Sequence, residues 1–302
     1  MAPSKIDLMI IGAQKAGSTS LAEYLAEHPR LRSALAMEFS YFLNPVERKQ
    51  GIDRVMDMNF PGTGASDELK LAKMSNLYCS PEGLKLLFDH NPQCLLVFVV
   101  RDPALRAYSA YQMACYDGWL DFSPDNFLEI FHRDERDELH ELFFGYGKYS
   151  SKLKDVFDVF PADQVMVFRF EDLKNDPKSV CGCIFNRLGI GRIDLVRVAN
   201  VHNRTTMARS TRAAKIINTI RVRGGTIKNI LKWSMPYAWY LKLGSFILDL
   251  NRSRFAFPPM DERTKLELAR YYRPFDMELS EMTGLDLSGW TSMQSAPVKE
   301  GQ

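Results

Sequence analysis

The sequence of 302 residues has few cysteines, little net charge and no long hydrophobic run. Its five cysteines are odd in number and scattered, which favours reduced thiols over a disulfide framework. Cys181 and Cys183 form a C-x-C pair, but no second pair or neighbouring histidine completes a metal site. No apolar segment reaches the roughly 20 residues that span a bilayer. We therefore expect no bound metal and no transmembrane helix.

The charge balance and the composition exclude further classes of protein. A net charge of +2 gives no argument for a nucleic-acid partner. Residues 1–7 lack the basic segment and apolar core of a secretory signal, so we expect a cytoplasmic protein. With 46% hydrophobic residues, the chain is long enough for one large α/β domain, which we place at residues 1–290. The last dozen residues, 291–302, are small, polar and charged, which predicts a disordered tail.

Residues 6–25 have the pattern of a strand, a tight loop and a helix. The run Leu8 to Ile11 is short and apolar, as in a buried parallel strand, and residues 18–25 carry apolar side chains at helical spacing. Between them, Gly12 and Gly17 allow the backbone to turn sharply. The loop N–H groups and the start of the helix would then face an anion. The sequence therefore predicts a phosphate-binding loop.

This loop departs from the G-x-x-x-x-G-K-[ST] pattern of ATP-binding proteins. Gly12, Gly17 and Thr19 fit, but Ser18 stands at the lysine position and the lysine has moved to Lys15. One alternative is an ATP- and Mg²⁺-dependent small-molecule kinase with an atypical loop. Its nearest candidate metal ligand is Asp102, whose proline neighbour favours a turn. Another alternative is a nucleotide-binding module without activity.

A second phosphate-binding segment follows residues 95–100, which are apolar and rich in β-branched side chains, as in a central strand. Arg101 comes directly after this strand, and ligands of open α/β sheets bind at the carboxyl ends of strands. The helix after Pro103 would bring Ser109 round to the same side. A guanidinium fork with a hydroxyl beside it suits a phosphate dianion.

These segments resemble those of sulfotransferases that use 3′-phosphoadenylyl sulfate (PAPS). Residues 12–19 are similar to that family's G-x-x-K-[AGS]-G-[ST]-[ST] loop, and residues 101–109 to its R-[ND]-P-x-x-R-A-[YF]-S segment. Residues 36–42 are similar to the K-E-x-x-[FY]-F signature of the branch that includes heparan-sulfate and many bacterial enzymes. The resemblance implies an α/β fold of the P-loop type, with a mainly parallel central sheet flanked by helices and helical insertions over the acceptor site.

The resemblance also implies roles for individual residues. Glu38 would remove the acceptor proton, although Met37 replaces the usual lysine before it. Lys15 would stabilise charge on the bridging and leaving oxygens, and Lys73 is a second candidate for that role. Binding of PAPS, or of the product PAP, would fall to the following residues: Gln14, Lys15, Ala16, Gly17, Ser18, Thr19, Ser20, Arg101, Ser109, Arg204 and Arg209.

The segment from 195 to 248 has no acidic residue and about ten lysine or arginine residues. Arg204 and Arg209 lie where related enzymes carry a loop that closes over the nucleotide, with Arg221 and Arg223 as the competing pair. This basic, aromatic-bearing segment could instead lie on an anionic membrane surface. The segment lacks a clean apolar helical face, so we do not expect membrane association.

The sequence thus favours transfer of a sulfuryl group from PAPS to a hydroxyl or amine. Lys15, Glu38, Arg101 and Ser109 are retained together, which favours an enzyme over an inactive binding module. We expect a small-molecule or carrier-bound acceptor from natural-product metabolism. Acidic residues between 134 and 141 suggest a cationic acceptor as one hypothesis. The identity of the acceptor and the oligomeric state stay open at this point.

Overall fold

The computed structural model describes residues 5–62, 67–196, 206–208 and 252–294. The chain divides into two compact units. The first contains residues 1–106, 144–201 and 265–302, and the second contains residues 107–143 and 202–264. Each unit is described separately below, and the assignment of residues 1–290 to a single domain stays a prediction.

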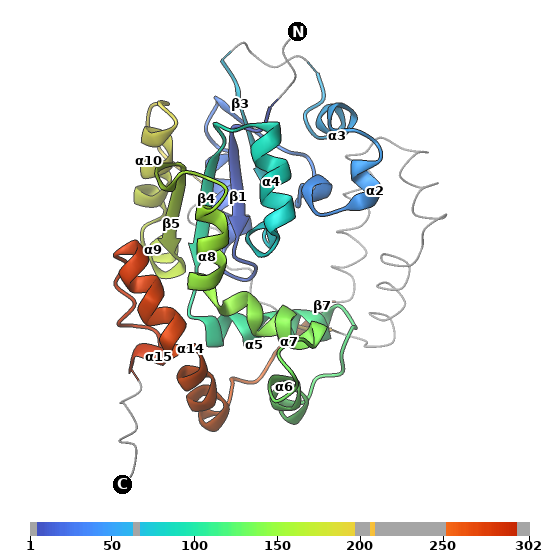
Figure 1. The fold of residues 1–302 in the computed structure, drawn as a ribbon, viewed down its shortest axis with the longest axis vertical. Helices are drawn as coiled ribbons and strands as arrows, with labels where there is room; N and C mark the ends of the chain where they lie inside the picture. The colour runs from blue at the N-terminus through green and yellow to red at the C-terminus, as the bar shows by residue number, and fades with distance from the viewer. Residues whose placement is uncertain (1–4, 63–66, 197–205, 209–251, 295–302) are drawn as a thin grey trace. The chain divides into compact units, whose positions relative to one another are not determined.

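The first unit is built on a parallel five-stranded sheet in the order β2-β3-β1-β4-β5 (Figure 1). The central strand β1 pairs on one side with β3 and on the other with β4, so that Leu8 lies opposite both Leu71 and Leu95. This sheet confirms the predicted α/β fold class with a mainly parallel sheet. The strands are β1 (Leu8–Gly12), β2 (Leu31–Ser33), β3 (Leu69–Lys73), β4 (Leu95–Val100) and β5 (Val165–Arg169).

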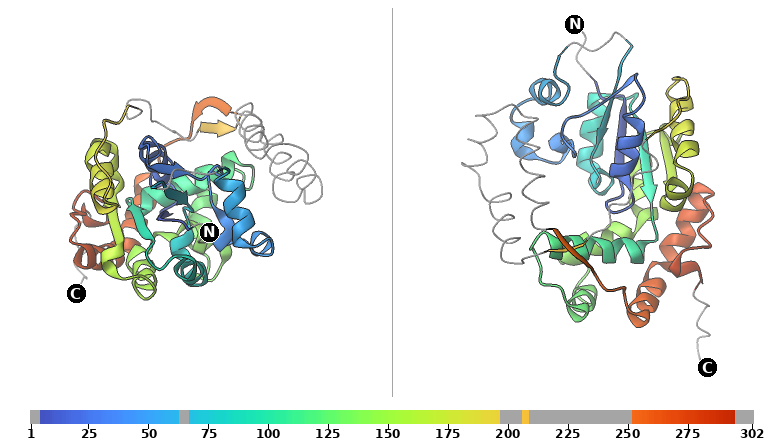
Figure 2. Two further views of the ribbon diagram at one scale, coloured as in Figure 1. Left: turned by 90° about the horizontal axis from the view of Figure 1, so that it is seen from above. Right: turned by 180° about the vertical axis from the view of Figure 1, so that it is seen from behind.

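Helices flank both faces of this sheet. α4 packs against α8 and lies with it in front of the sheet in Figure 1. α1 packs against α10, and the view from behind in Figure 2 shows α1 over the opposite face. Helices α4 and α10 begin at side-chain caps, since Ser80 accepts a hydrogen bond from the Gly83 amide and Asp176 accepts one from the Ser179 amide. The principal helices of this unit are α1 (Ser18–Leu25), α2 (Pro45–Arg48), α3 (Ile52–Asn59), α4 (Pro81–His90), α8 (Tyr149–Phe157), α9 (Phe170–Asn175), α10 (Pro177–Arg187) and α15 (Thr291–Gln294).

The second unit has an aromatic core. The Tyr111 ring lies 5.1 Å from Phe127 and 5.9 Å from Phe143, and its hydroxyl donates a hydrogen bond to the Ser123 carbonyl at 2.8 Å. The elements here are α6 (Pro124–Phe131), α7 (Glu138–Phe143) and the antiparallel pair β6 (Thr206–Ala208) and β7 (Arg252–Ala256). Two longer helices belong to both units: α5 (Pro103–Tyr116) and α14 (Glu262–Thr283).

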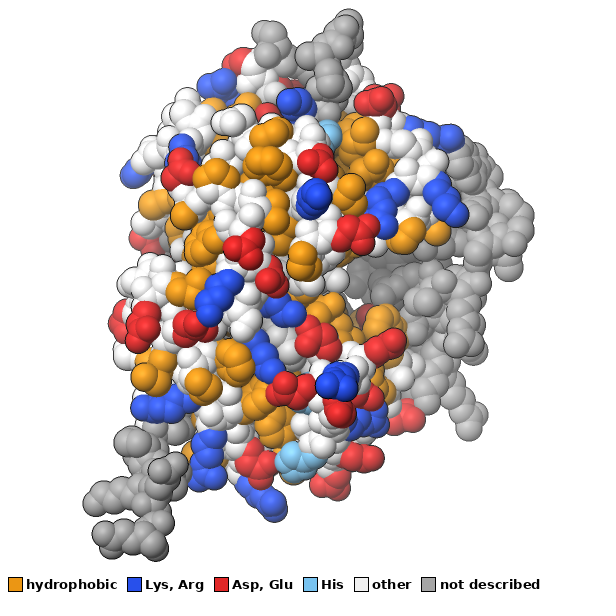
Figure 3. All heavy atoms as spheres, viewed as in Figure 1, with side chains coloured by type: hydrophobic (Ala, Val, Ile, Leu, Met, Phe, Trp, Pro, Cys, Tyr) orange, Lys and Arg blue, Asp and Glu red, His pale blue; other side chains and the backbone are white. Residues whose placement is uncertain are grey.

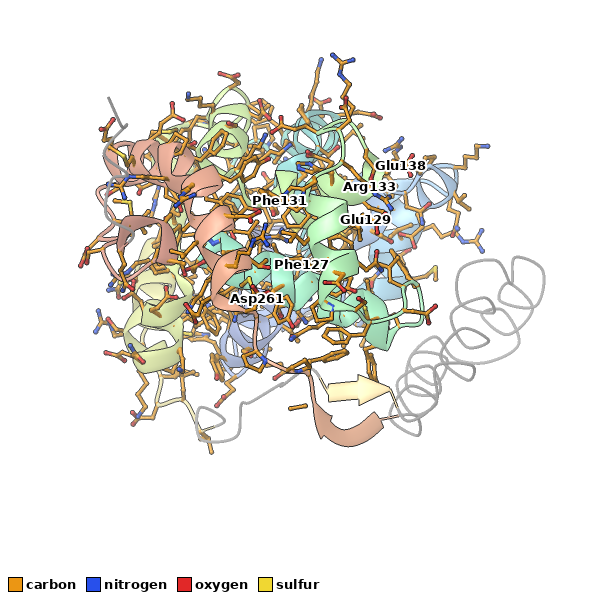
Figure 4. All side chains as sticks on the ribbon, turned by 90° about the horizontal axis from the view of Figure 1, so that it is seen from below. Phe127, Glu129, Phe131, Arg133, Glu138 and Asp261 are labelled. Atoms are coloured by element: carbon orange, nitrogen blue, oxygen red, sulfur yellow. The ribbon has the colours of Figure 1, made fainter. Side chains whose placement is uncertain are left out.

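Charged side chains of both signs are spread over the face of the molecule drawn in Figure 3. Over α4 and α8, the face in Figure 3 carries acidic and basic side chains interspersed. In the second unit, Figure 4 shows Glu129, Phe131 and Arg133 in succession along α6 and the turn after it, with Glu138 at the start of α7. Glu129 and Glu138 are exposed, so this acidic region is a solvated surface of its unit. In the described part of the chain, no helix combines the length and apolarity needed to cross a membrane.

The end of the described chain differs from the expected tail. Residues 291–294 form α15 instead of disordered chain. The Thr291 amide donates a hydrogen bond to the Asp102 carboxylate at 2.6 Å, and the Ser292 hydroxyl donates one to Asp276. Asp276 is fully buried, and among the residues that the structure describes its other carboxylate oxygen finds no hydrogen-bond partner. Burial raises the pKa of Asp276 to about 8, and the neighbouring Asp102 acts in the same direction.

This buried carboxyl makes stability depend on pH. The native state keeps a proton that the unfolded chain loses above the ordinary pKa of 3.8, so Asp276 stabilises the fold at low pH, and that stabilisation is lost as the pH rises towards 8. Asp276→Asn stays neutral and can still accept from Ser292. Relative to this variant, the wild type should lose about 1.4 kcal/mol of unfolding free energy per unit between pH 5 and 7. Urea unfolding at several pH values tests this, and parallel pH profiles would contradict it.

Candidate active site

The predicted phosphate loop connects the carboxyl end of β1 to the start of α1. The Ala13 amide donates a hydrogen bond to the Val99 carbonyl at 2.7 Å, which fixes the loop to the neighbouring strand β4. Lys15 and Gly17 have positive φ angles of 69° and 87°. Helix α1 begins without a side-chain cap and has no acidic residue in its first turn. Its first N–H groups therefore suit an external anion, which the helix dipole favours.

Close packing requires the two loop glycines. A Cβ atom on Gly12 would lie 2.4 Å from the Tyr78 ring, and one on Gly17 would lie 3.1 Å from the Phe170 ring. The first distance is far below van der Waals contact, so no side chain fits at Gly12 without movement of the buried Tyr78. The shape of the loop is thus determined by aromatic side chains from residues far along the chain.

A charged cluster lies beside the loop helix. The Lys73 ammonium, at the end of β3, donates hydrogen bonds to Glu38 Oε1 at 2.6 Å and to Thr19 Oγ1 at 3.1 Å. Ser75 donates from its hydroxyl to Glu38 Oε1 at 2.9 Å and from its amide to Oε2 at 2.8 Å. The Lys73 side chain is 5% exposed and that of Glu38 36% exposed. Glu38 can therefore receive a proton from a solvent-side substrate while its orientation stays fixed.

Backbone contacts hold the segment that carries Glu38. The Leu35 amide donates to the Asn59 carbonyl at 3.0 Å, and the Ala36 amide donates to Asn59 Oδ1 at 3.0 Å. On the other side of Glu38, the Phe39 amide donates to the Lys73 carbonyl at 2.7 Å. The buried Asn59 at the end of α3 and the end of β3 therefore fix this segment from both directions.

Arg101 comes directly after β4, next to the loop. Its Nη1 donates a hydrogen bond to the Lys15 carbonyl at 2.9 Å, and its guanidinium lies 5.0 Å from the centre of the Phe170 ring. Burial lowers the pKa of Arg101, while Tyr149 and Asp102 oppose this shift. Among the described residues, no carboxylate forms an ion pair with this guanidinium, which has five N–H donors. A half-buried guanidinium of this kind fits an anionic phosphate group.

The Asp102 carboxylate accepts hydrogen bonds from two parts of the fold. Its Oδ1 accepts from the amides of Ala104 and Leu105 at 3.0 and 3.1 Å, which caps α5. Its Oδ2 accepts from the amide and the hydroxyl of Thr291. Both carboxylate oxygens therefore hold helix starts, that of α5 and that of α15. The residue that a kinase would need as a metal ligand is thus already occupied by hydrogen bonds.

The structure brings together most of the residues that the sequence singled out. Lys73 contacts both Glu38 and Thr19, and Arg101 contacts Lys15. Ser109 lies on α5 in the second unit, so its role stays a prediction. Gln14, Ala16, Gly17, Ser18 and Ser20 lie in the loop and the first turn of α1. Arg204 and Arg209, and the competing Arg221 and Arg223, lie outside the described residues.

Sequence reasoning missed three residues that shape this site. Ser75 binds both oxygens of Glu38, Asn59 holds the segment before it, and Phe170 supports Arg101 and the loop. None of them carries a local pattern that indicates a site. Their contacts join residues that lie at least 23 positions apart in the sequence, so only the folded chain reveals them.

The chain has relatives of known activity in sequence. Residues 5–221 match the sulfotransferase domain. Over 303 residues, the chain is 24% identical to bifunctional heparan sulfate N-deacetylase/N-sulfotransferase 4 of Mus musculus, covering 96% of this chain and 32% of that protein. It is 25% identical to heparan sulfate glucosamine 3-O-sulfotransferase 3B1 of Homo sapiens, covering 93% and 64%. The chain thus spans about a third of the length of the first of these relatives.

A solved structure has the same fold. The crystal structure of a sulfotransferase from Alicyclobacillus acidocaldarius superimposes with a TM-score of 0.65 at 21% identity. The match covers 95% of this chain and 99% of that chain.

Replacement of Gly12 by alanine tests how closely the loop is packed against Tyr78. Gly12→Ala should lower the free energy of unfolding by about 1 to 3 kcal/mol, because the new methyl group overlaps the Tyr78 ring. Gly191→Ala is the matched control, since a Cβ there meets nothing within 4 Å. The control should change stability by less than about 0.5 kcal/mol. Urea denaturation measures both, and equal effects would contradict the packing argument.

Proposed function

This chain belongs to the sulfotransferase domain family, and from that premise we propose that it transfers the sulfuryl group of PAPS to an acceptor hydroxyl or amine. The observation that carries the proposal is the hydrogen-bonded cluster of Glu38, Lys73 and Thr19 beside the phosphate loop. A fixed carboxylate, an ammonium and an anion-binding helix start are the groups that this reaction needs. We propose a small-molecule or carrier-bound acceptor.

The loop and Arg101 would bind the donor nucleotide. The N–H groups of residues 17–20 would hold the 5′-phosphate at the positive end of α1. Arg101 and Ser109 would hold the 3′-phosphate, and the half-buried guanidinium has the N–H donors for it. Gln14, Lys15 and Ala16 complete the loop around these groups.

The transfer itself depends on position and charge. The acceptor oxygen or nitrogen forms a bond to sulfur, the bond from sulfur to the bridging phosphate oxygen breaks, and the acceptor proton passes to Glu38. Negative charge grows on the bridging oxygen as that bond breaks, so Lys15 and Lys73 would stabilise it. Holding the acceptor atom, the sulfur and the bridging oxygen in a line supplies much of the remaining rate acceleration.

The alternative of a small-molecule kinase has less support from the site. A kinase needs an acidic ligand for Mg²⁺ near the phosphates. Asp102 was the nearest candidate, and both its oxygens accept hydrogen bonds from α5 and from Thr291. Ser18 also occupies the position of the lysine in an ATP-binding loop.

Nucleotide binding separates the two functions. We expect calorimetry to show binding of 3′-phosphoadenosine 5′-phosphate (PAP) in EDTA, and weaker binding of ATP with Mg²⁺. Arg101→Ala should weaken PAP binding by about 10- to 100-fold, because a charged hydrogen-bond donor is lost. Arg187→Ala removes an exposed arginine paired with Asp163 and should leave PAP binding unchanged. A preference for ATP with Mg²⁺, or an undiminished affinity in Arg101→Ala, would refute the donor assignment.

Turnover tests the proton acceptor. Glu38→Gln should lower kcat by about 10²- to 10⁴-fold, since general base catalysis is lost, while the Kd for PAP stays within about twofold. Lys15→Ala should lower kcat by about 10²-fold, as expected for the loss of one charge-stabilising donor. Glu82→Gln, which removes an exposed carboxylate paired with Arg48, is the control and should retain full activity. Near wild-type turnover in Glu38→Gln with intact folding would mean that another group takes the proton.

A further inference from the structure

We infer that the C-terminal strap, residues 286–294, is part of the proposed donor site and sets its affinity for the 3′-phosphate. Thr291 is the positioning residue of this strap, and it acts on Arg101 through Asp102. The inference rests on the proposed binding of PAPS and adds to it a segment that no phosphate motif indicates. Its basis is a series of hydrogen bonds between the strap and the carboxyl ends of β4 and β5.

The strap contacts the carboxyl end of β5 and the helix that follows it. The Arg169 guanidinium donates a hydrogen bond to the Asp286 carbonyl. On α9, Glu171 accepts a hydrogen bond from Trp290 Nε1 at 3.5 Å, and Figure 1 shows the red end of the described chain beside this helix. Since β4 and β5 pair in parallel, these contacts lie at the sheet edge that also carries Arg101 and the phosphate loop.

At the end of β4, the strap binds the Asp102 carboxylate. Its Oδ2 accepts from the Thr291 amide at 2.6 Å and from the Thr291 hydroxyl at 2.5 Å, while its Oδ1 accepts from two amides at the start of α5. Asp102 is only 3% exposed, and within the described ranges it forms no ion pair. The stability of its negative charge therefore depends on these hydrogen bonds.

The charge of Asp102 acts on the neighbouring Arg101. Burial lowers the pKa of Arg101, whereas Tyr149 and Asp102 raise it. If the Thr291 hydroxyl were removed, Asp102 Oδ2 would keep a lone pair without a donor beside this guanidinium. The carboxylate would then compete with an incoming phosphate for the N–H groups of Arg101. Thr291 therefore favours phosphate binding because it occupies the carboxylate.

The strap is itself held in place on both sides of Thr291. Its neighbours Trp290 and Ser292 are buried. The Trp290 ring lies 6.2 Å from the Tyr149 ring on α8, and the Ser292 carbonyl accepts a hydrogen bond from Arg273 Nη1 on α14 at 2.9 Å. Two helices thus fix the strap, and Thr291 is presented to Asp102 at a constant position.

Removal of the Thr291 hydroxyl tests this role. Thr291→Val keeps the amide donor and the size of the side chain, and it should raise the Kd for PAP at least about fivefold, because a hydrogen bond to a charged group is lost. The Kd for adenosine 5′-monophosphate should stay within about twofold, since this nucleotide lacks the phosphate that Arg101 would bind. Thr291→Ser keeps the hydroxyl and should bind PAP like the wild type. Calorimetry on the whole chain measures these values.

A double-mutant cycle shows whether the effect passes through Arg101. In the Arg101→Ala background, Thr291→Val should raise the Kd for PAP by less than about twofold, because the guanidinium for which Asp102 would compete is absent.

Thr264→Val is the matched control. Thr264 donates from its amide to Asp261 Oδ1 at 2.9 Å and from its hydroxyl to Oδ2 at 2.6 Å, at the start of α14. The substitution therefore removes the same kind of hydrogen bond from a different helix start. We expect similar losses of stability in urea for Thr264→Val and Thr291→Val, and an unchanged Kd for PAP in Thr264→Val.

The outcomes separate this inference from the proposed function. If Thr291→Val leaves the Kd for PAP unchanged, or weakens both nucleotides equally, the strap only supports the fold and the inference is wrong, while the donor assignment stands. The inference also fails if Thr264→Val weakens PAP binding as much, or if the effect of Thr291→Val persists in Arg101→Ala. If the wild type does not bind PAP, the proposed function fails and the inference fails with it.

Discussion

The ammonium group of Lys73 joins three segments that are far apart in the sequence, and the candidate site depends on this junction. It binds Thr19 in the first turn of α1 and Glu38 in the segment after β2, while its own residue ends β3. A buried ammonium without an anionic partner would be strongly unfavourable. The need to pair this charge therefore fixes Glu38 beside the loop helix, and Ser75 then sets the direction of both carboxylate oxygens.

The parallel sheet makes this junction possible. Since β3, β1 and β4 are neighbours and run in the same direction, their carboxyl ends deliver Lys73, the phosphate loop and Arg101 to one edge. Arg101 then reaches back to the Lys15 carbonyl, which ties the end of β4 to the middle of the loop. The adjacent Asp102 holds α5 and Thr291 instead of a ligand. Of these two consecutive residues at the end of β4, Arg101 is the one proposed to bind the donor nucleotide, and Asp102 supports the surrounding structure.

The sequence predicted those parts of the fold whose signals are local. Strand β4 and helix α1 begin and end where their apolar residues and the glycines before α1 indicated. Strand β3 was missed, because Lys70 interrupts its apolar residues and its burial arises only between β1 and β2. In the site, resemblance to known motifs identified Glu38 and Lys73 separately. The contact between Glu38 and Lys73, and the contacts of Ser75 and Asn59 with the same segment, join residues that are distant in the sequence. No local pattern predicts such contacts.

The same junction also bears on the order of charge movements in the proposed reaction. When Glu38 accepts a proton it becomes neutral, and the Lys73 ammonium, only 5% exposed, loses its counter-ion. That loss is costly unless another negative charge develops within its reach. Lys73 already donates to Thr19 at the start of α1, where the breaking bond would leave charge on the phosphate oxygen. Proton transfer to Glu38 and breaking of the bond to sulfur would therefore favour each other. The Lys73 ammonium would lose the charge of the Glu38 carboxylate as it gains that of the phosphate oxygen.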